Sequence, residues 1–121
     1  MEKHFEKANE LYNNENYAEA LKWYNKAIEF DAKGNTASLL YNSGVCCMKL
    51  NRHNKAIPYF QQALRICKDS KYYYNIGYSY YCIGETSKAL LNFNTAWALN
   101  NEDDECKKAI NLILREKFKT K

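Results

Sequence analysis

Small and large apolar residues recur in one fixed pattern at three places along this chain of 121 residues. At each place an alanine is followed four residues later by an aromatic residue, and seven residues later by a second alanine. This spacing keeps all three side chains on one face of an α-helix. The three sets are Ala20, Tyr24 and Ala27; Ala56, Phe60 and Ala63; and Ala89, Phe93 and Ala96. Their first alanines lie 36 and then 33 residues apart, a period that indicates stacked helical repeats.

A second helical segment precedes each of these sets, at residues 4–16, 40–52 and 73–85. Each segment carries a small residue twelve positions before the first alanine of the set that follows: Ala8, Gly44 or Gly77. Glycine inside a helix costs about 1 kcal/mol relative to alanine, so its presence there needs a packing reason. We expect the small residue to leave room for the aromatic residue of the next helix.

Short polar links join the two helices of each pair and predict that the helices run antiparallel. The links contain Asn16, Asn51 and Gly84, residue types that tolerate the left-handed conformation that ends a helix.

The last segment, residues 104–118, predicts one further helix. Asn100 or Asn101 can cap it, and the acidic residues at 102–105 suit the positive end of the helix dipole. Cys106, Ala109, Ile110, Ile113 and Leu114 form one apolar stripe. A stacked array needs its last face covered, so we expect a capping helix. The whole pattern predicts seven antiparallel helices in one all-α domain, residues 1–121, with repeats at approximately 1–34, 37–69 and 70–103 and the capping helix at approximately 104–118.

Composition and charge place the chain among ordinary globular proteins, with 46% hydrophobic and 26% charged residues. The net charge is +4, and residues 33–84 carry seven basic side chains against one acidic side chain. A basic middle could favour an acidic partner, or it could be a solvated face. The charged start of the chain has no apolar core of a signal peptide, and no apolar run reaches the roughly 18 residues that span a membrane. We therefore expect a cytoplasmic protein.

The five cysteines, Cys46, Cys47, Cys67, Cys82 and Cys106, include no CxxC pair. We expect them to be reduced, small buried residues and not ligands of a metal.

Three consecutive repeats of about 34 residues, each with a small residue, alanine, aromatic residue and alanine at these spacings, resemble the tetratricopeptide repeat (TPR) family. The chain departs from the family pattern where a proline usually closes each repeat, because Ala32, Lys68 and Asn101 stand there. The resemblance implies an α–α superhelix, or solenoid. It also implies a protein–protein interaction module, adaptor-like or co-chaperone-like, that works as a monomer.

In the family, the first helix of each pair lines a concave groove that holds an extended peptide or a helix of another protein. Carried over by position, the resemblance implies a groove lined by Phe5, Asn9, Tyr12, Tyr41, Asn42, Val45, Met48, Lys49, Lys71, Tyr74, Asn75, Tyr78 and Tyr81. Tyrosine supplies contact area and a polar group at little entropic cost, which suits recognition. The other interpretation is that some of these rings only pack against their neighbours.

Three other functions remain open to the sequence. The chain could be a structural scaffold or assembly segment that acts through its convex face or helix edges. A carboxylate clamp for chaperone C-termini matches at Asn9, Asn42 and Lys71, but the resemblance would require a lysine in place of Phe5 and an arginine in place of Asn75. Nucleic acid binding could use basic residues interleaved with tyrosines, but a net charge of +4 is modest for it.

The sequence does not support catalysis. Its two histidines, His4 and His53, stand alone, and there is neither a Ser-His-acid or Cys-His set nor a glycine-rich phosphate loop. We expect no enzymatic activity, no cofactor, no metal and no small-molecule substrate.

Overall fold

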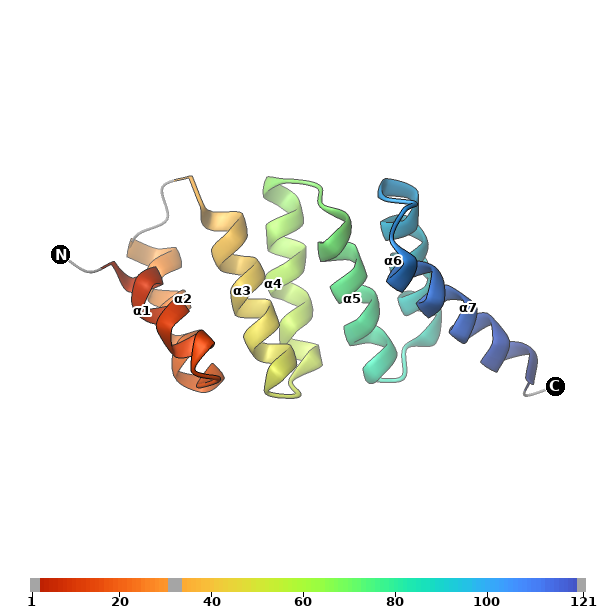
Figure 1. Cartoon of the computed structure of the whole chain (residues 1–121), viewed down its shortest axis with the longest axis horizontal. Helices are drawn as coiled ribbons and strands as arrows, with labels where there is room; N and C mark the ends of the chain where they lie inside the picture. Colours follow the sequence, from red (N-terminus) through yellow and green to blue (C-terminus); the bar gives the residue numbers. More distant parts are fainter. Residues whose placement is uncertain (1–2, 31–33, 120–121) are drawn as a thin grey trace. The chain divides into compact units, whose positions relative to one another are not determined.

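The structure, a computed structural model, describes residues 3–30 and 34–119, and all regular elements in these residues are α-helices (Figure 1). They are α1 (His4–Asn13), α2 (Tyr17–Phe30), α3 (Thr36–Lys49), α4 (His53–Ile66), α5 (Ser70–Cys82), α6 (Thr86–Leu99) and α7 (Asp104–Lys119). The expected all-α architecture of seven helices is confirmed.

The helices belong to two compact units, Met1–Lys68 with α1 to α4 and Asp69–Lys121 with α5 to α7. In the first unit, each helix packs against the next one along the chain. In the second unit, α5 packs against α6 and α6 packs against α7. The organisation as one domain with three repeats at the stated bounds stays a prediction.

The recurring alanines and aromatic residues form the core of both units, as expected. All nine are buried, and the most exposed of them, Phe93, shows only 2% of its surface. A Cβ atom on Gly44 would lie 2.7 Å from the Phe60 ring, and one on Gly77 would lie 2.8 Å from the Phe93 ring. The aromatic residue of each second helix therefore occupies the space that the missing glycine side chain leaves, which confirms the packing reason for both glycines.

The turn inside each helix pair contains one residue with positive φ: Glu15 at 62°, Asn51 at 60° and Gly84 at 85°. Asn51 and Gly84 were expected, but the expectation for Asn16 was wrong. Asn16 already belongs to the start of α2, because its carbonyl oxygen accepts the Ala20 N–H at 2.9 Å. All three positive-φ residues stand five positions before the first alanine of their set. Position within the repeat therefore predicts the residue with positive φ better than residue type does.

We expect Glu15→Gly to raise the free energy of unfolding by about 0.5–1 kcal/mol, because a residue with a Cβ is strained in the left-handed region. Glu15 is exposed, so the lost side chain removes little packing. Urea denaturation followed by circular dichroism measures the change. Gly84→Ala is the converse test and should lower the free energy of unfolding by a similar amount; neutral results for both would contradict the role of these turns.

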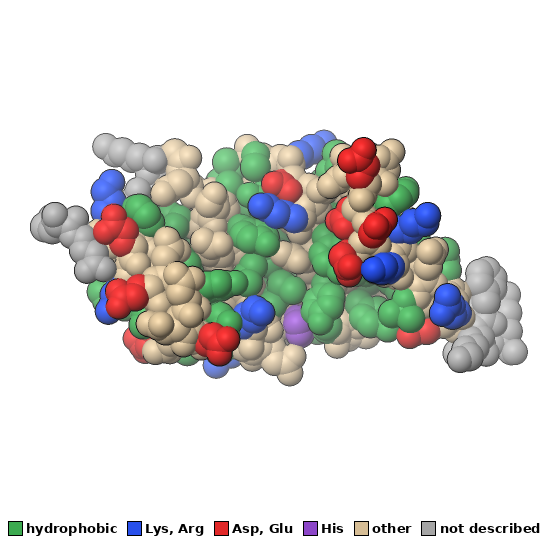
Figure 2. Space-filling view, viewed as in Figure 1, with side chains coloured by type: hydrophobic (Ala, Val, Ile, Leu, Met, Phe, Trp, Pro, Cys, Tyr) green, Lys and Arg blue, Asp and Glu red, His purple; other side chains and the backbone are tan. Residues whose placement is uncertain are grey.

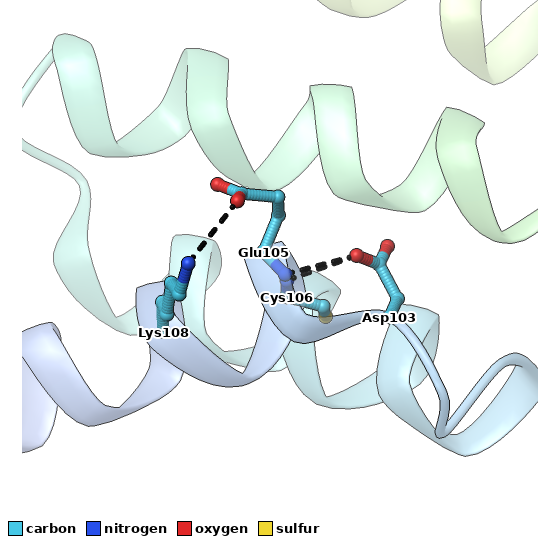
Figure 3. Close-up of polar contacts among 4 residues, drawn as sticks. All are labelled: Asp103, Glu105, Cys106 and Lys108. Atoms are coloured by element: carbon cyan, nitrogen blue, oxygen red, sulfur yellow. Dashed lines mark hydrogen bonds and ion pairs between the residues drawn. The ribbon is translucent and has the colours of Figure 1, made fainter.

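The first turn of α7 is capped by Asp103 (Figure 3). Its Oδ1 accepts the N–H groups of Glu105 at 3.1 Å and Cys106 at 3.3 Å. The expectation of a cap at Asn100 or Asn101 was therefore wrong; Asn100 instead accepts the N–H of Glu102 at 3.3 Å in the preceding turn. Farther along, the Cys106 thiol donates to the Phe93 carbonyl at 2.9 Å, which ties α7 to α6.

All five cysteines are free thiols. Cys46, Cys47 and Cys106 are buried as expected, but Cys67 and Cys82 are exposed. Cys67 directly follows α4 and Cys82 is the last residue of α5, and helix ends receive less cover from neighbouring helices than helix centres do.

Candidate peptide-binding surfaces

In the first unit, the residues expected to line a groove lie on α1 and α3. Phe5, Asn9 and Tyr12 come from α1, and Tyr41, Asn42, Val45, Met48 and Lys49 come from α3. Tyr12 lies near residues of both helices: burial raises the pKa of its hydroxyl, and Tyr17, Cys46 and Tyr41 raise it further.

Two of these residues, Asn9 and Asn42, converge on one buried hydroxyl. The Tyr24 hydroxyl donates to Asn9 Oδ1 at 2.5 Å. Burial raises the pKa of Tyr24 to about 12, with contributions from Cys46 and Tyr12, while a hydrogen bond from the Asn42 side chain acts in the opposite direction. Both asparagines therefore support the interior of the unit. Asn9 is itself exposed and uses only its Oδ1 in this bond, so the case against a carboxylate clamp rests on Phe5 and Asn75, which stand at two of its cationic positions.

The aromatic residues of the first unit are partly covered by their neighbours. Tyr12 meets Tyr17 edge-on at 5.3 Å between ring centroids, and Tyr41 lies 5.8 Å from Phe60. Phe5 packs against the core cluster. Val45 and Met48 are half-buried as well, while Lys49 is exposed and holds its ammonium 6.0 Å from the Tyr17 ring. This surface therefore contains aromatic rings packed against their neighbours, together with exposed side chains such as Lys49.

In the second unit, three of the expected residues line one surface pocket of about 220 Å³. Tyr74, Tyr78 and Tyr81 of α5 form one wall. The remaining lining comes from α6 and α7: Phe93, Glu105, Lys108, Ala109, Leu112 and Ile113. We call it the α5–α7 pocket. Lys71 and Asn75, which were also expected to face a ligand, lie on α5 but do not line this pocket.

Sequence reasoning missed the α7 side of this pocket because α7 was assigned only the role of a cap. The signal was present in the spacing. Glu105, Lys108, Ala109 and Leu112 stand at i, i+3, i+4 and i+7, so they share a helix face that overlaps the expected apolar stripe at Ala109. Of that stripe, Cys106 and Ile113 are buried as expected, whereas Leu114 is 36% exposed.

The walls of the α5–α7 pocket are mostly apolar. Tyr74 packs 5.3 Å from Phe93, while Tyr78 and Leu112 remain 42% and 46% exposed. Figure 2 shows hydrophobic side chains at the surface of α5 and α7, beside charged side chains along α7. An apolar cavity of about 150 Å³ holds a benzene molecule, and drug-sized ligands occupy about 300–1,000 Å³. The pocket therefore has room for one or two side chains of a partner.

Polar groups stand at the margins of the pocket. The Tyr81 hydroxyl donates to Glu116 Oε1 at 3.1 Å and Oε2 at 3.2 Å. Lys108 and Glu105 form an exposed ion pair at 3.5 Å (Figure 3). Burial, together with Glu105 and Asp103, raises the pKa of Tyr74, and the nearby Cys82 and burial raise that of Tyr78. Both phenols are neutral at physiological pH, as tyrosine already is at its ordinary pKa of 10.0, and Tyr78 forms a hydrogen bond with the Cys82 side chain.

The histidines have contacts of their own. The His4 ring lies 5.8 Å from Trp23 and 5.5 Å from Phe30, and His53 Nε2 lies 3.1 Å from Asn51 Oδ1.

Across the residues that the structure describes, no group of three or more His, Cys, Asp or Glu side chains is placed to hold a metal ion. Within the same residues, no helix has both the length and the apolar character that crossing a membrane requires.

The helical hairpins, the alanine–aromatic core and the pocket beside first helices define a helical-repeat protein of the kind that binds other proteins. The family model described as "Tetratricopeptide repeat" matches residues 6–69 and 35–102. The chain belongs to the tetratricopeptide repeat family, and it is a protein-interaction module.

Two relatives share part of their length with this chain. The human and mouse proteins called "Cell division cycle protein 16 homolog" are each 33% identical to it over 100 residues, which is 76% of this chain and 16% of the relative. The chain therefore spans only about a sixth of the length of these relatives.

Solved TPR domains share the fold. The Sgt2 TPR domain from Aspergillus fumigatus superposes with a TM-score of 0.83 at 16% identity, covering 98% of this chain and 79% of that one. The Arabidopsis OM64 TPR domain gives 0.84 at 22% identity, covering 93% of each chain. The second TPR domain of human RPAP3, solved in complex with the HSP70 peptide SGPTIEEVD, gives 0.82 at 20% identity, covering 92% of each chain. At these identities the likeness shows the fold.

Proposed function

We propose that this chain binds a peptide or a helix of a partner protein through the residues that its first helices expose, with the α5–α7 pocket holding an anchor side chain. The pocket is the observation that carries the proposal. It joins three exposed or half-buried tyrosines to an aliphatic wall from α7, and interfaces concentrate their binding energy in such aromatic-lined pockets.

The RPAP3 domain supports peptide binding as a use of this fold. The ligand of this chain differs in one respect, since a terminal carboxylate finds little charge here. Phe5 and Asn75 replace two cationic positions of the clamp, and Asn9 and Asn42 hold the Tyr24 hydroxyl. We therefore propose recognition by an apolar anchor and phenol hydrogen bonds, and not by a carboxylate clamp.

A scaffold role is the second candidate, because large apolar side chains remain exposed on second helices. Phe30 at the end of α2 and Leu91 on α6 are each 66% exposed. An assembly that used them would associate through second helices and would not require the pocket.

The test starts from peptides selected against the whole chain from a random phage-displayed library, followed by measurement of the dissociation constant of one selected peptide. We expect Tyr78→Ala to weaken binding by about tenfold or more, the size of an interface hot spot. Leu91→Ala, which removes a more exposed side chain outside the pocket, should change it less than about twofold. The Tyr41→Ala variant reports whether the first unit takes part.

Equal binding by wild type, Tyr78→Ala and a Leu112→Ala variant would contradict the pocket as the anchor site. Light scattering would test the scaffold role. If the measured mass of the wild type rose with concentration and Leu91→Ala reduced that rise, the scaffold role would replace the proposal.

The proposal includes a monomeric, non-catalytic chain in the cytoplasm whose partner is another protein, with no role for a small-molecule substrate, a cofactor or nucleic acid. The five free thiols are consistent with a reducing compartment.

A further inference from the structure

The Tyr81 hydroxyl connects the end of α5 to the last turn of α7. It donates to the Glu116 carboxylate, at 3.1 Å to Oε1 and 3.2 Å to Oε2, across 35 residues of sequence. The ring of Tyr81 packs against the core of the second unit and lines the α5–α7 pocket. One side chain therefore extends from the core along the pocket to α7. We call this contact the Tyr81–Glu116 link.

Glu116 carries a charge that its place in the helix does not favour. The C-terminal end of a helix dipole is negative and favours basic side chains. Arg115 and Lys117 follow this rule, but Glu116 stands between them near the end of α7. The helix by itself gives no reason for a carboxylate here, whereas a carboxylate at this point accepts the Tyr81 hydroxyl.

The start of α7 is firmly attached, but its end has little cover from the other helices. Near the start, the Cys106 thiol donates to the Phe93 carbonyl. Farther along, Ile113 is buried, but the described side chains that follow it, at 114–117, are all exposed. The Tyr81–Glu116 link is therefore placed to hold the end of α7 beside α5.

The link also lies beside the outer walls of the pocket. Tyr78 stands three residues before Tyr81, and Leu112 stands four residues before Glu116, so each wall residue is one helical turn from the link. An anchor that needs more room has to push the Tyr81 ring aside. That movement breaks a hydrogen bond to a charged acceptor, which is stronger than a bond between neutral groups.

We propose that Glu116 is a positioning residue of the α5–α7 pocket, which holds the Tyr81 ring in place and thereby limits the size of the anchor side chain. The inference rests on the proposed function where it concerns the anchor. The link itself can be measured without any ligand. In this arrangement Glu116 acts on the anchor through Tyr81.

The first experiment tests the link in the whole chain without a peptide, by amide hydrogen exchange observed with nuclear magnetic resonance. Glu116→Ala and Tyr81→Phe remove the link, Glu116→Gln keeps an oxygen that accepts the hydroxyl, and Arg115→Ala is a neighbouring control. We expect exchange at residues 114–117 to rise by about threefold or more in the first two variants, the size of one modest hydrogen bond, and to change by less than about twofold in the other two. The helix dipole predicts the opposite for Glu116→Ala, because losing a negative charge near the C-terminal end favours the helix.

The titration of the Tyr81 hydroxyl is a second signature of the link. The hydrogen bond to Glu116 is the main cause that raises its pKa above 10.0. The tyrosine ring carbons report this titration by nuclear magnetic resonance, and Tyr81→Phe assigns the signal. We expect the pKa of Tyr81 to fall toward 10.0 in Glu116→Ala. A Glu116 that only supported the helix would leave this pKa unchanged.

The size limit is tested with the peptide selected against the whole chain, prepared with leucine and with tryptophan at its anchor position. We expect the ratio of the two dissociation constants, tryptophan over leucine, to fall by about threefold or more in Glu116→Ala and Tyr81→Phe, because the hydrogen bond no longer opposes the larger side chain. Glu116→Gln and Arg115→Ala should leave the ratio within about twofold of the wild-type value.

Unchanged exchange at residues 114–117, together with an unchanged pKa of Tyr81 in Glu116→Ala, would overturn the inference. An unchanged ratio in Glu116→Ala and Tyr81→Phe would also overturn it if Tyr78→Ala weakened binding, and the proposed function would then stand. If Tyr78→Ala left binding unchanged, the proposed function would fail and the size limit with it. The exchange and the pKa would still decide whether Glu116 holds the end of α7.

Discussion

Raising the pH above 9 is expected to destabilise the first unit strongly, because two groups buried at its centre ionise readily in the unfolded chain but resist ionisation in the folded chain. Tyr24 and Cys46 are 1% and 0% exposed. Burial is the main cause that raises the pKa of Tyr24 from 10.0 to about 12, and burial followed by the neighbouring Cys47 raises that of Cys46 from 9.0 to about 12. Both shifts favour the neutral forms in the folded chain.

The sign of the effect follows from these directions. A raised folded-state pKa stabilises the fold fully below the unfolded value, here 9.0 for the thiol and 10.0 for the phenol, and the stabilisation is lost as the pH rises toward about 12. One pKa unit corresponds to about 1.4 kcal/mol, so the combined loss for the two groups is on the order of 7 kcal/mol.

Urea denaturation at a series of alkaline pH values, with a phosphine reductant present, measures this loss by circular dichroism. The variants Tyr24→Phe and Cys46→Ala should each flatten the dependence of the free energy of unfolding on pH, whatever they do to its value at neutral pH. Cys67→Ala removes an exposed thiol and should leave the dependence unchanged. An unaltered slope in the Tyr24→Phe, Cys46→Ala double variant would contradict the assignment.

The burial of Tyr24 could be predicted from the sequence, but the hydrogen bonds of its hydroxyl could not. The repeat register correctly placed Tyr24 in the core, because burial of a helix face follows from helical spacing alone. The positions of Asn9 and Asn42 in the repeats likewise predicted that both would lie near a groove. It could not show that both asparagines bond to Tyr24, because that depends on the distance between α1, α2 and α3 and on the side-chain rotamers.

The errors at the turns and caps have a related cause. Asn16 and Asn100 are residue types that suit turns and caps, but the structure uses Glu15 for the positive φ and Asp103 for the cap. At Glu15, position in the repeat outweighs residue preference; at Asp103 the residue type suits a cap, and the error was in where α7 begins. The spacing within α7 indicates which of its residues share a face, but the α5–α7 pocket also needs α7 to lie against α5 and α6, and the spacing within one helix does not set that placement.

The second large effect expected is a loss of about 1–3 kcal/mol in the free energy of unfolding for Gly77→Ala, even though alanine is the better helix former by about 1 kcal/mol. The added Cβ would lie 2.8 Å and 2.9 Å from two carbons of the Phe93 ring, whereas carbon atoms pack favourably at about 3.5–4.0 Å. The ring is 2% exposed and packs against Tyr74, so a movement away from the added Cβ would disturb contacts that stabilise the second unit.

Two further variants separate this clash from a general effect of substitution in α5. Ser79→Ala lies on the same helix and removes a buried hydroxyl that has no hydrogen-bond partner among the described residues, so it should cost nothing. Phe93→Leu, destabilising alone, should cost less in the Gly77→Ala background because it removes the clashing ring. Additive losses would show that Gly77 and Phe93 do not share this space.

The clash also reaches the proposed binding site, because Phe93 lines the α5–α7 pocket as well as filling the gap at Gly77. A Cβ at residue 77 that displaces this ring changes the pocket floor against which Tyr74 packs. We therefore expect Gly77→Ala to weaken binding of the selected peptide at temperatures where the chain is still folded. If Gly77→Ala destabilised the chain but left its affinity for the peptide unchanged, the packing of Phe93 against residue 77 would not affect the pocket. Binding of the anchor side chain would then depend on the outer residues Tyr78 and Leu112.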